Sequence, residues 1–384
     1  MTTSPVKNKR SFLRLSIIFG LLALALSTGV IFTTRNAEVA GMTYYVNCSA
    51  SSNGSGTQSS PWNTLTTVDS TTFHPGDTIL FARGTTCSGE LHPLGSGSSG
   101  ASISIDAYGT GALPIISAGT NSAALELSDQ QYWTIADLEI TGGNPRSVYI
   151  TGDTANATLN SIHLTNLTVT GTQGTITKRS DNGLVVVEPQ ASLEKFNDVV
   201  LNGITAYSTS ESEGIYVSGS STWSGYGSQA LNTNVTVENS TVHDVGADGI
   251  LVMEAQNATL QHNVVYNSGQ CTRCGSKPTP NGLWEWYCWT CTVQYNESYN
   301  NSTWGSGDGG DFDIDYFNSN NVVQYNYGHD SAGYCVSFFG ANNAADTNNT
   351  FRYNVCANDD RRTGQGGVFL LYLGWGDTQW GSDL

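Results

Sequence analysis

The stretch TVQYNESYN (residues 292–300) recurs four more times in the second half of the chain. The other copies are TVENSTVHD (236–244), TLQHNVVYN (259–267), VVQYNYGHD (322–330) and TFRYNVCAN (350–358). Each copy is too short and too polar to fold alone, whereas stacked copies would bury one apolar column between neighbours. The repeat therefore predicts an all-β solenoid, a right-handed parallel β-helix whose coils rise by about 4.8 Å, the spacing of strands in a sheet.

Two columns emerge when the copies are aligned. The apolar column extends backwards into weaker copies and contains Ile135, Leu164, Leu201, Val237, Leu260, Val293, Val323 and Phe351. The polar column contains Ser240, Asn263, Asn296, Asn326 and Asn354. Stacked asparagines can hydrogen-bond from coil to coil, so we interpret the polar column as structural rather than as a set of ligands.

A second strand opens with glycine in most coils: NGLVVVE (182–188), EGIYVSG (213–219), DGILVME (248–254), NGLWEWY (281–287), GDFDIDY (310–316), AGYCVSF (332–338) and GGVFLLY (366–372). The expected inward column is Leu184, Ile215, Ile250, Leu283, Phe312, Tyr334 and Val368. Because side chains alternate along a strand, Asp313 and Asp315 should face outward, with Trp284 and Trp286 on the same face one coil earlier. Glu285 should point inward unless a bulge turns that strand.

Composition limits the partners. Only 12% of the 384 residues are charged and the formal net charge is −17. Nucleic acids and anionic membranes attract clustered Lys and Arg, so both are excluded as expected partners. A polysaccharide or oligosaccharide fits better, either neutral or acidic and held through a cation.

The N-terminus indicates export. Lys7, Lys9, Arg10 and Arg14 precede an uncharged run over 15–32, and a small-residue stretch follows. We interpret residues 1–41 as a signal peptide or an N-terminal membrane anchor, and 42–384 as one β-helix domain. The protein is then secreted or anchored at the cell surface, and we expect a monomer.

Eight cysteines in an exported protein favour disulfides. Cys48 and Cys87 should pair, while Cys335 and Cys356 either pair or leave Cys335 free. The motifs CTRC and CWTC place Cys271, Cys274, Cys288 and Cys291 at a spacing that resembles a four-cysteine zinc site. Outside the cell we favour cross-paired disulfides that clamp the loop 271–291, which argues against zinc there.

The outward acids indicate glycoside cleavage, which uses a general acid and a base or nucleophile. Asp313 and Asp315 are the main catalytic candidates, and Asp311, in the glycine column, is the third. Their i, i+2 spacing puts the Cα atoms roughly 6.6 Å apart, which is compatible with both retaining and inverting geometry. Trp284, Trp286 and Tyr216 are candidate sugar subsites, and His329 and Glu297 are further substrate-binding candidates that could equally be turn residues.

Two other functions remain open. Asp308 and Asp311 could hold Ca²⁺, as a calcium-dependent polysaccharide lyase would require, whereas hydrolysis needs no cofactor. A lyase also needs a basic residue, and residues 180–351 contain only Lys195, Arg273 and Lys277. The third possibility is a non-catalytic glycan-binding or cell-surface solenoid.

Several stretches carry a family resemblance. FHPGDTILFARGTTCSGEL (73–91) and SGSSGASISIDAYGTGALPIISA (96–118) resemble the N-terminal coil of secreted bacterial β-helix proteins of the pectin-lyase-like superfamily. LWEWYCWTCTVQYNESYNNSTWGSGDGGDFDID (283–315) and NNVVQYNYGHDSAGY (320–334) are similar to its glycoside-hydrolase-like subgroup. That subgroup usually reads DGEGFDID, so Asp308, Asp313 and Asp315 match while Gly310 and Asp311 depart. The resemblance implies an extracellular enzyme that degrades polysaccharides.

Overall fold

The computed structural model describes residues 41–174, 181–220, 230–271, 280–303, 308–341, 346–362 and 368–375. The chain divides into two units, Met1–Val39 and Ala40–Leu384, and only the second contains described residues. The expected signal peptide or anchor (1–41) lies almost wholly outside the described residues. No helix in the described ranges has the length and hydropathy needed to cross a membrane.

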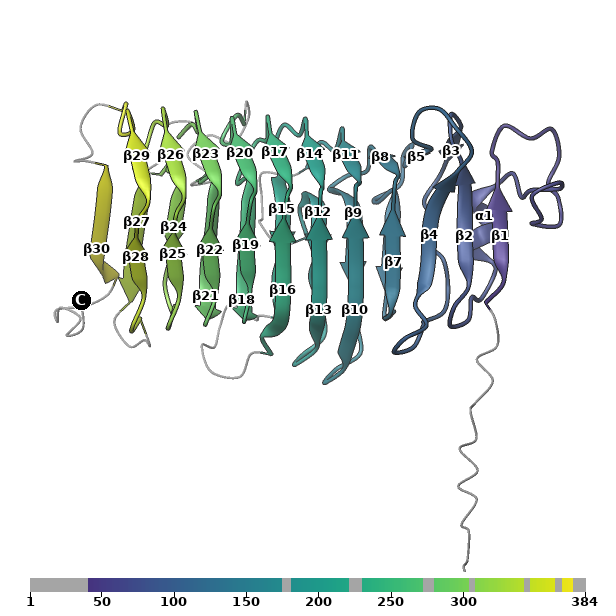
Figure 1. The fold of residues 1–384 in the computed structure, drawn as a ribbon, viewed down its shortest axis with the longest axis horizontal. Helices are drawn as coiled ribbons and strands as arrows, with labels where there is room; N and C mark the ends of the chain where they lie inside the picture. Colours follow the sequence, from purple (N-terminus) through teal and green to yellow (C-terminus); the bar gives the residue numbers. More distant parts are fainter. Residues whose placement is uncertain are drawn as a thin grey trace, which may run out of the picture. The chain divides into compact units, whose positions relative to one another are not determined.

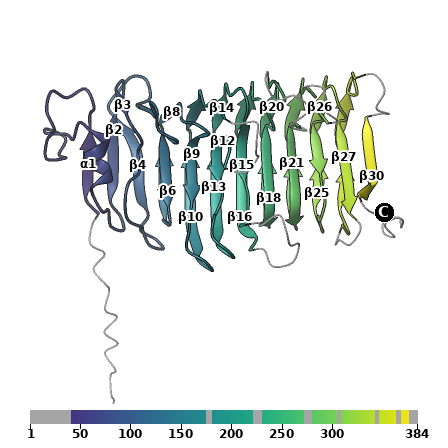
Figure 2. The ribbon, with the colours of Figure 1, turned by 180° about the vertical axis from the view of Figure 1, so that it is seen from behind.

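The second unit is built from three ladders of parallel strands, which stack along its long axis (Figures 1 and 2). Ladder I consists of β6 (Leu125–Ser128), β9 (Arg146–Thr151), β12 (Gly183–Val187), β15 (Glu213–Val217), β18 (Ile250–Gln256), β21 (Leu283–Trp289), β24 (Phe312–Ile314), β27 (Val336–Ala341) and β30 (Phe369–Trp375). Ladder II consists of β1 (Thr43–Val46), β2 (Thr78–Ala82), β4 (Ile103–Tyr108), β7 (Trp133–Ala136), β10 (Thr158–Thr165), β13 (Lys195–Asn202), β16 (Asn232–Glu238), β19 (Thr259–Gln261), β22 (Thr292–Gln294), β25 (Val322–Gln324) and β28 (Thr350–Arg352).

Ladder III completes each coil with a short strand. It consists of β3 (Thr86–Ser88), β5 (Ile115–Ser117), β8 (Glu139–Thr141), β11 (Thr168–Thr170), β14 (Thr205–Tyr207), β17 (Thr241–His243), β20 (Val264–Tyr266), β23 (Glu297–Tyr299), β26 (Tyr327–His329) and β29 (Val355–Ala357). The chain visits ladders I, II and III in turn, and the single helix of the described residues, α1 (Leu65–Asp69), lies before β2. The predicted parallel β-helix is confirmed.

The strand register confirms the apolar column of the repeats. Leu260 pairs with Val293, Val293 with Val323 and Val323 with Phe351, all in ladder II. These side chains belong to one hydrophobic core that fills the solenoid, with Phe351 partly buried at its edge. Burying one column per coil is what a repeat of this size needs in order to be stable.

The asparagine column forms the predicted hydrogen-bonded ladder at the corner between ladders II and III. The backbone N–H of Asn263 donates to Oδ1 of Asn296 at 2.9 Å, and the N–H of Asn296 donates to Oδ1 of Asn326 at 2.9 Å. The same contact continues from Asn326 to Asn354 at 3.0 Å. Each asparagine thus satisfies a backbone donor that the turn would otherwise leave buried and unpaired.

The predicted inward column of ladder I is confirmed for the central coils and is wrong for the coils at both ends. Ile215, Ile250, Leu283 and Phe312 are paired in register as predicted. Val185, Val336 and Phe369 hold the positions that we assigned to Leu184, Tyr334 and Val368. The glycine that guided the alignment does not stand at a constant distance from the strand, so counting from it misplaces the outer coils.

The cysteines follow the prediction in part. Cys48 pairs with Cys87 and Cys335 pairs with Cys356. Cys271 is also disulfide-bonded, and Cys274 lies outside the described residues. The expected clamp across 271–291 is wrong for Cys288, in β21, and for Cys291, just before β22, which are both free and buried in the interior.

Candidate active site

The outward face of ladder I carries the predicted acid. Asp313 pairs in register with Trp284 of the preceding coil and with Ser337 of the following one. Tyr216 and Leu251 continue this outward column towards the N-terminus. Asp315 follows one step along the strand, where its N–H donates to the carbonyl of Glu285 at 3.0 Å. The alternation read from GDFDIDY therefore gives the correct face for Asp313, whereas Asp315 lies just after β24, which ends at Ile314.

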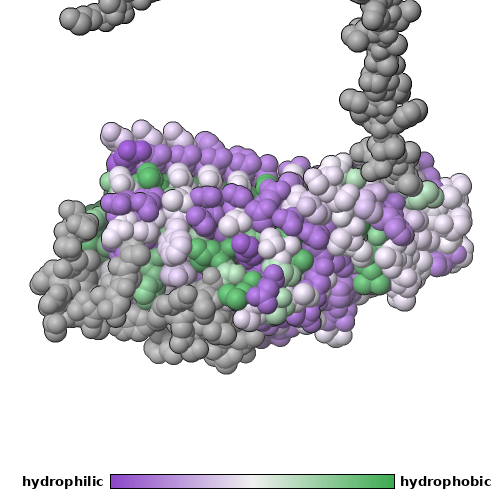
Figure 3. Space-filling model, turned by 90° about the horizontal axis from the view of Figure 1, so that it is seen from below, coloured by the Kyte–Doolittle hydropathy of each residue, from purple (hydrophilic) through white to green (hydrophobic). Residues whose placement is uncertain are grey.

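The aromatic neighbours are packed rather than open. Trp284, Trp286 and Tyr216 are only 3%, 7% and 3% exposed. They form a second hydrophobic cluster, separate from the solenoid core, with Ala123, Tyr149, Val186, Leu251 and Met253. A sugar can stack only on a ring whose face is open to solvent, so the structure does not support the sugar subsites that we expected on these rings. The rings instead form apolar surroundings for the outward acids. Where the view from below in Figure 3 is not covered by grey atoms, small hydrophobic patches lie among hydrophilic residues.

Asp313 lies in a dry, negatively charged environment. It is 4% exposed, and Nδ2 of Asn281 donates to its Oδ2 at 3.1 Å. Burial raises the pKa of Asp313 well above its usual range, and the charges of Asp315 and Asp308 raise it further, whereas a hydrogen bond with the Ser337 hydroxyl lowers it. Asp313 consequently remains protonated at a pH at which an ordinary aspartate is ionised.

Asp308 is held next to this acid by residues that the sequence did not single out as partners. The Tyr334 hydroxyl donates to Oδ1 of Asp308 at 2.7 Å, and Nη1 of Arg362 donates to the Asp308 carbonyl at 2.9 Å. Burial, followed by the charges of Asp308 and Asp313, raises the pKa of Tyr334, so the phenol stays a donor. Asn281 precedes the glycine of its strand and is visible in the repeat, but Arg362 lies between the repeats TFRYNVCAN (350–358) and GGVFLLY (366–372) and carries no signal of its own.

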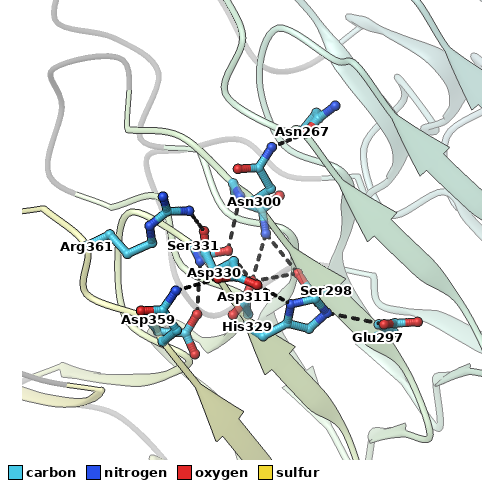
Figure 4. A network of polar contacts seen from close by, with 12 residues as sticks. Asn267, Glu297, Ser298, Asn300, Asp311, His329, Asp330, Ser331, Asp359 and Arg361 are labelled. Atoms are coloured by element: carbon cyan, nitrogen blue, oxygen red, sulfur yellow. Dashed lines mark hydrogen bonds and ion pairs between the residues drawn. The ribbon is translucent and has the colours of Figure 1, made fainter.

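The side chain of Asp311 lies inside the solenoid, on the opposite side of ladder I from Asp313. Ser298 and Ser331 donate to its Oδ1 at 3.0 and 2.6 Å (Figure 4). Nδ2 of Asn301 donates to the same oxygen at 2.9 Å. It is fully buried. Burial, followed by the charge of Asp359, raises its pKa. The structure therefore separates Asp311 from Asp313, so Asp311 is not one of the outward acids as we expected. For the same reason Asp311 does not form the candidate calcium site with Asp308.

His329 and Glu297 belong to ladder III rather than ladder I. Nε2 of His329 lies 3.2 Å from Oε1 of Glu297, and its Nδ1 lies 2.8 Å from Oδ2 of Asp330 (Figure 4). The imidazole also stacks on Tyr299 with 4.8 Å between ring centroids. This stack continues through Tyr266, His243 and Tyr207. The structure does not bring these two residues to Asp313. It confirms the expected stack with Tyr299 and Tyr266, but both residues lie in strands rather than in turns.

Potential metal ligands gather at two places in the described residues. One group is Cys335, Cys356 and Asp359, in which the disulfide removes both thiolates. The other is Glu285, Cys288 and Cys291 inside the solenoid. Asp308, Asp313 and Asp315 do not form such a group within the described ranges. Chemically, the outward site offers a protonated acid next to carboxylates, an arrangement suited to proton transfer.

Known proteins share this architecture. Residues 192–375 match the family described as "Right handed beta helix region", which confirms the handedness. The GH136 lacto-N-biosidase from Eubacterium ramulus is similar in structure, with a TM-score of 0.68 and 21% identity, over 87% of this chain and 67% of that one. An alginate lyase from Paenibacillus sp. str. FPU-7 is similar with a TM-score of 0.53 and 17% identity, over 87% of this chain and 99% of the lyase. Comparison with curated proteins finds no match.

Proposed function

We propose that this chain, whose fold is the right-handed parallel β-helix of the pectin-lyase-like superfamily, is an extracellular carbohydrate-active enzyme that hydrolyses glycosidic bonds on the outward face of ladder I. One observation carries the proposal: Asp313 is a buried acid whose pKa is raised next to the charges of Asp315 and Asp308. Glycoside hydrolysis needs such a division between one protonated carboxyl group and another carboxylate.

The roles follow from exposure. Asp313, kept protonated by its surroundings, donates a proton to the leaving glycosidic oxygen. Asp315 is half-buried and closer to solvent, so it acts on the sugar or on water as the nucleophile or base. Asp308, fixed by the Tyr334 hydroxyl, supports the negative field that keeps Asp313 protonated. The aromatic cluster around Trp284 keeps the site dry, which strengthens each of these electrostatic effects.

The structural neighbours support a carbohydrate substrate, since one is a lacto-N-biosidase and the other an alginate lyase. The lyase is also the second candidate function for this chain, and Arg362 favours it. A lyase needs a base, and Arg362 supplies a basic side chain next to Asp308 and Tyr334, where the repeats themselves provide none. Such a lyase would bind an acidic sugar through a calcium ion, but Asp308, Asp313 and Asp315 do not form a metal-binding group in the described part of the chain, which weighs against this second candidate.

A panel of neutral and uronate-containing glycans separates the functions. Hydrolysis predicts new reducing ends without unsaturated products, whereas a lyase predicts unsaturated uronates that disappear with a calcium chelator. Binding without products would indicate a non-catalytic solenoid. We expect Asp313→Asn and Asp315→Asn to lose hydrolysis and Asp198→Asn, at an exposed acid of β13, to retain it. Full turnover in both site variants would disprove the assignment of these residues.

A further inference from the structure

Three polar side chains turn into the apolar interior of one coil. Glu285 of β21 is fully buried, Cys288 is 0% exposed and Cys291 is 1% exposed. Their strands pair with β18 and β19 of the preceding coil. In that coil the three equivalent positions are held by Val252, Ala255 and Ala258. The fold therefore does not require polar groups at this corner, and their presence in a single layer calls for an explanation.

The three side chains converge. One carboxylate oxygen of Glu285 and the two sulfurs all lie within 4.8 Å of one another. Neither Glu285 oxygen has a hydrogen-bond partner among the described residues. The sulfurs lie next to backbone carbonyls, with Cys288 Sγ 3.6 Å from the oxygen of Val252 and Cys291 Sγ 3.8 Å from that of Ala255. A buried carboxyl group without a partner is costly, so a ligand that pairs with it would be bound favourably.

We propose that Glu285, Cys288 and Cys291 bind a zinc ion. Two thiolates and one carboxylate suit a borderline-soft cation and do not suit calcium, which prefers oxygen ligands only. Tetrahedral zinc, with Zn–S about 2.3 Å and Zn–O about 2.0–2.2 Å, places its ligand atoms roughly 3.5–3.8 Å apart. The ligand atoms must therefore move inward by about 1 Å or less, a shift that side-chain rotations can supply.

This set differs from the four-cysteine site that the sequence resembles, because Cys271 is disulfide-bonded. On binding, the two thiols and the carboxyl group release their protons, and the ion takes their place. Three protein ligands leave one tetrahedral position for a backbone carbonyl or a water molecule. The ion would hold β21 from the interior side of the solenoid. Trp284 and Trp286 project from the outward face of the same strand.

Because the site is closed, the ion must enter before the coil is complete. The test therefore uses the full chain, unfolded under reducing conditions and refolded with either zinc or a chelator. Bound zinc is then measured by elemental analysis after gel filtration. We expect one zinc per chain, a higher unfolding midpoint than in the chelator-refolded protein, and thiolate-to-metal absorption when cobalt(II) replaces zinc.

The preceding coil supplies a matched variant that should fold. Combining Glu285→Val, Cys288→Ala and Cys291→Ala copies the layer of Val252, Ala255 and Ala258, and this variant should retain no zinc. Glu297→Gln, on ladder III, should bind as the wild type does. If the reduced, refolded wild type retains no more zinc than the triple variant, the proposal is wrong. Isolation of a Cys288–Cys291 disulfide, followed by failure to take up zinc after reduction, would overturn it equally.

Discussion

Replacing Asn296 by alanine tests the asparagine ladder, the feature on which the register of the whole solenoid depends. The Asn296 amide nitrogen donates to the carbonyl of Leu260 at 2.9 Å and to Oδ1 of Asn326 at 3.0 Å. Its Oδ1 accepts from the backbone N–H of Asn263 at 2.9 Å and from the amide of that residue at 3.0 Å. All four contacts are buried, so water cannot replace them in the folded protein.

The magnitude follows from the groups left unpaired. Asn296→Ala removes the partner of one buried N–H, on Asn263, and of one buried carbonyl, on Leu260. Each such group costs about 1–3 kcal/mol, so the free energy of unfolding should fall by about 4 kcal/mol, roughly a thousandfold in the folding equilibrium.

The control is Gln294→Ala, two residues earlier in the same coil. Nε2 of Gln294 donates to Gln261 at 3.1 Å and its Oε1 accepts from Gln324 at 2.9 Å, but these amides are partly exposed. Solvent can replace their hydrogen bonds, so we expect a loss below about 1 kcal/mol. Guanidinium unfolding followed by both tryptophan fluorescence and circular dichroism measures the difference, provided that the two probes coincide. Equal losses for the two variants would show that the ladder does not stabilise the coil as argued.

Three further outcomes are expected. Asp313→Asn should lower kcat on the substrate found in the glycan panel by about 10²–10⁴-fold with an unchanged circular dichroism spectrum, and an undiminished kcat would remove its role as the acid. Activity should fall as pH rises through the raised pKa of Asp313, and Ser337→Ala, which removes a hydroxyl that lowers this pKa, should move that limb of the pH–rate profile to higher pH. Burial lowers the pKa of His329, but its contacts with Asp330 and Glu297 outweigh burial and raise it. Protonated His329 therefore stabilises the folded state fully below the ordinary histidine pKa of about 6.5, and this stabilisation is lost as pH rises through the pKa of His329 in the folded protein. In His329→Phe the unfolding midpoint should depend less on pH over this range. An unchanged pH dependence would contradict the prediction.

The repeats made the fold and part of the site predictable. The spacing of Val293 and Asn296 recurs in the coils of Leu260, Val323 and Phe351, so one alignment fixes both columns of ladder II and its corner there. Alternation within GDFDIDY then gave the outward direction of Asp313. Alternation applies only within a strand. Asp311 precedes β24, which begins at Phe312, so the direction of its side chain does not follow from alternation, and the structure turns it inward.

Other features depend on contacts that no local pattern records. The burial of Trp284 and Trp286 results from packing across coils, and sequence alternation says only which way a side chain faces, not what lies over it. Arg362 reaches Asp308 from 54 residues away. The inward position of Glu285 was expected from parity, but only the structure shows that Cys288 and Cys291 meet it in the same layer.

The paired positions of ladder II lie 23 to 37 residues apart in sequence, as Val237 with Leu260 and Leu164 with Leu201 show. Such unequal coils can stack only because every change of length falls between the strands. Evolution can therefore lengthen a loop, or gain and lose a whole coil, without disturbing its neighbours. Deleting a single residue within β24 would instead exchange the two faces of that strand, so that Asp313 would point into the core and no longer outward from ladder I.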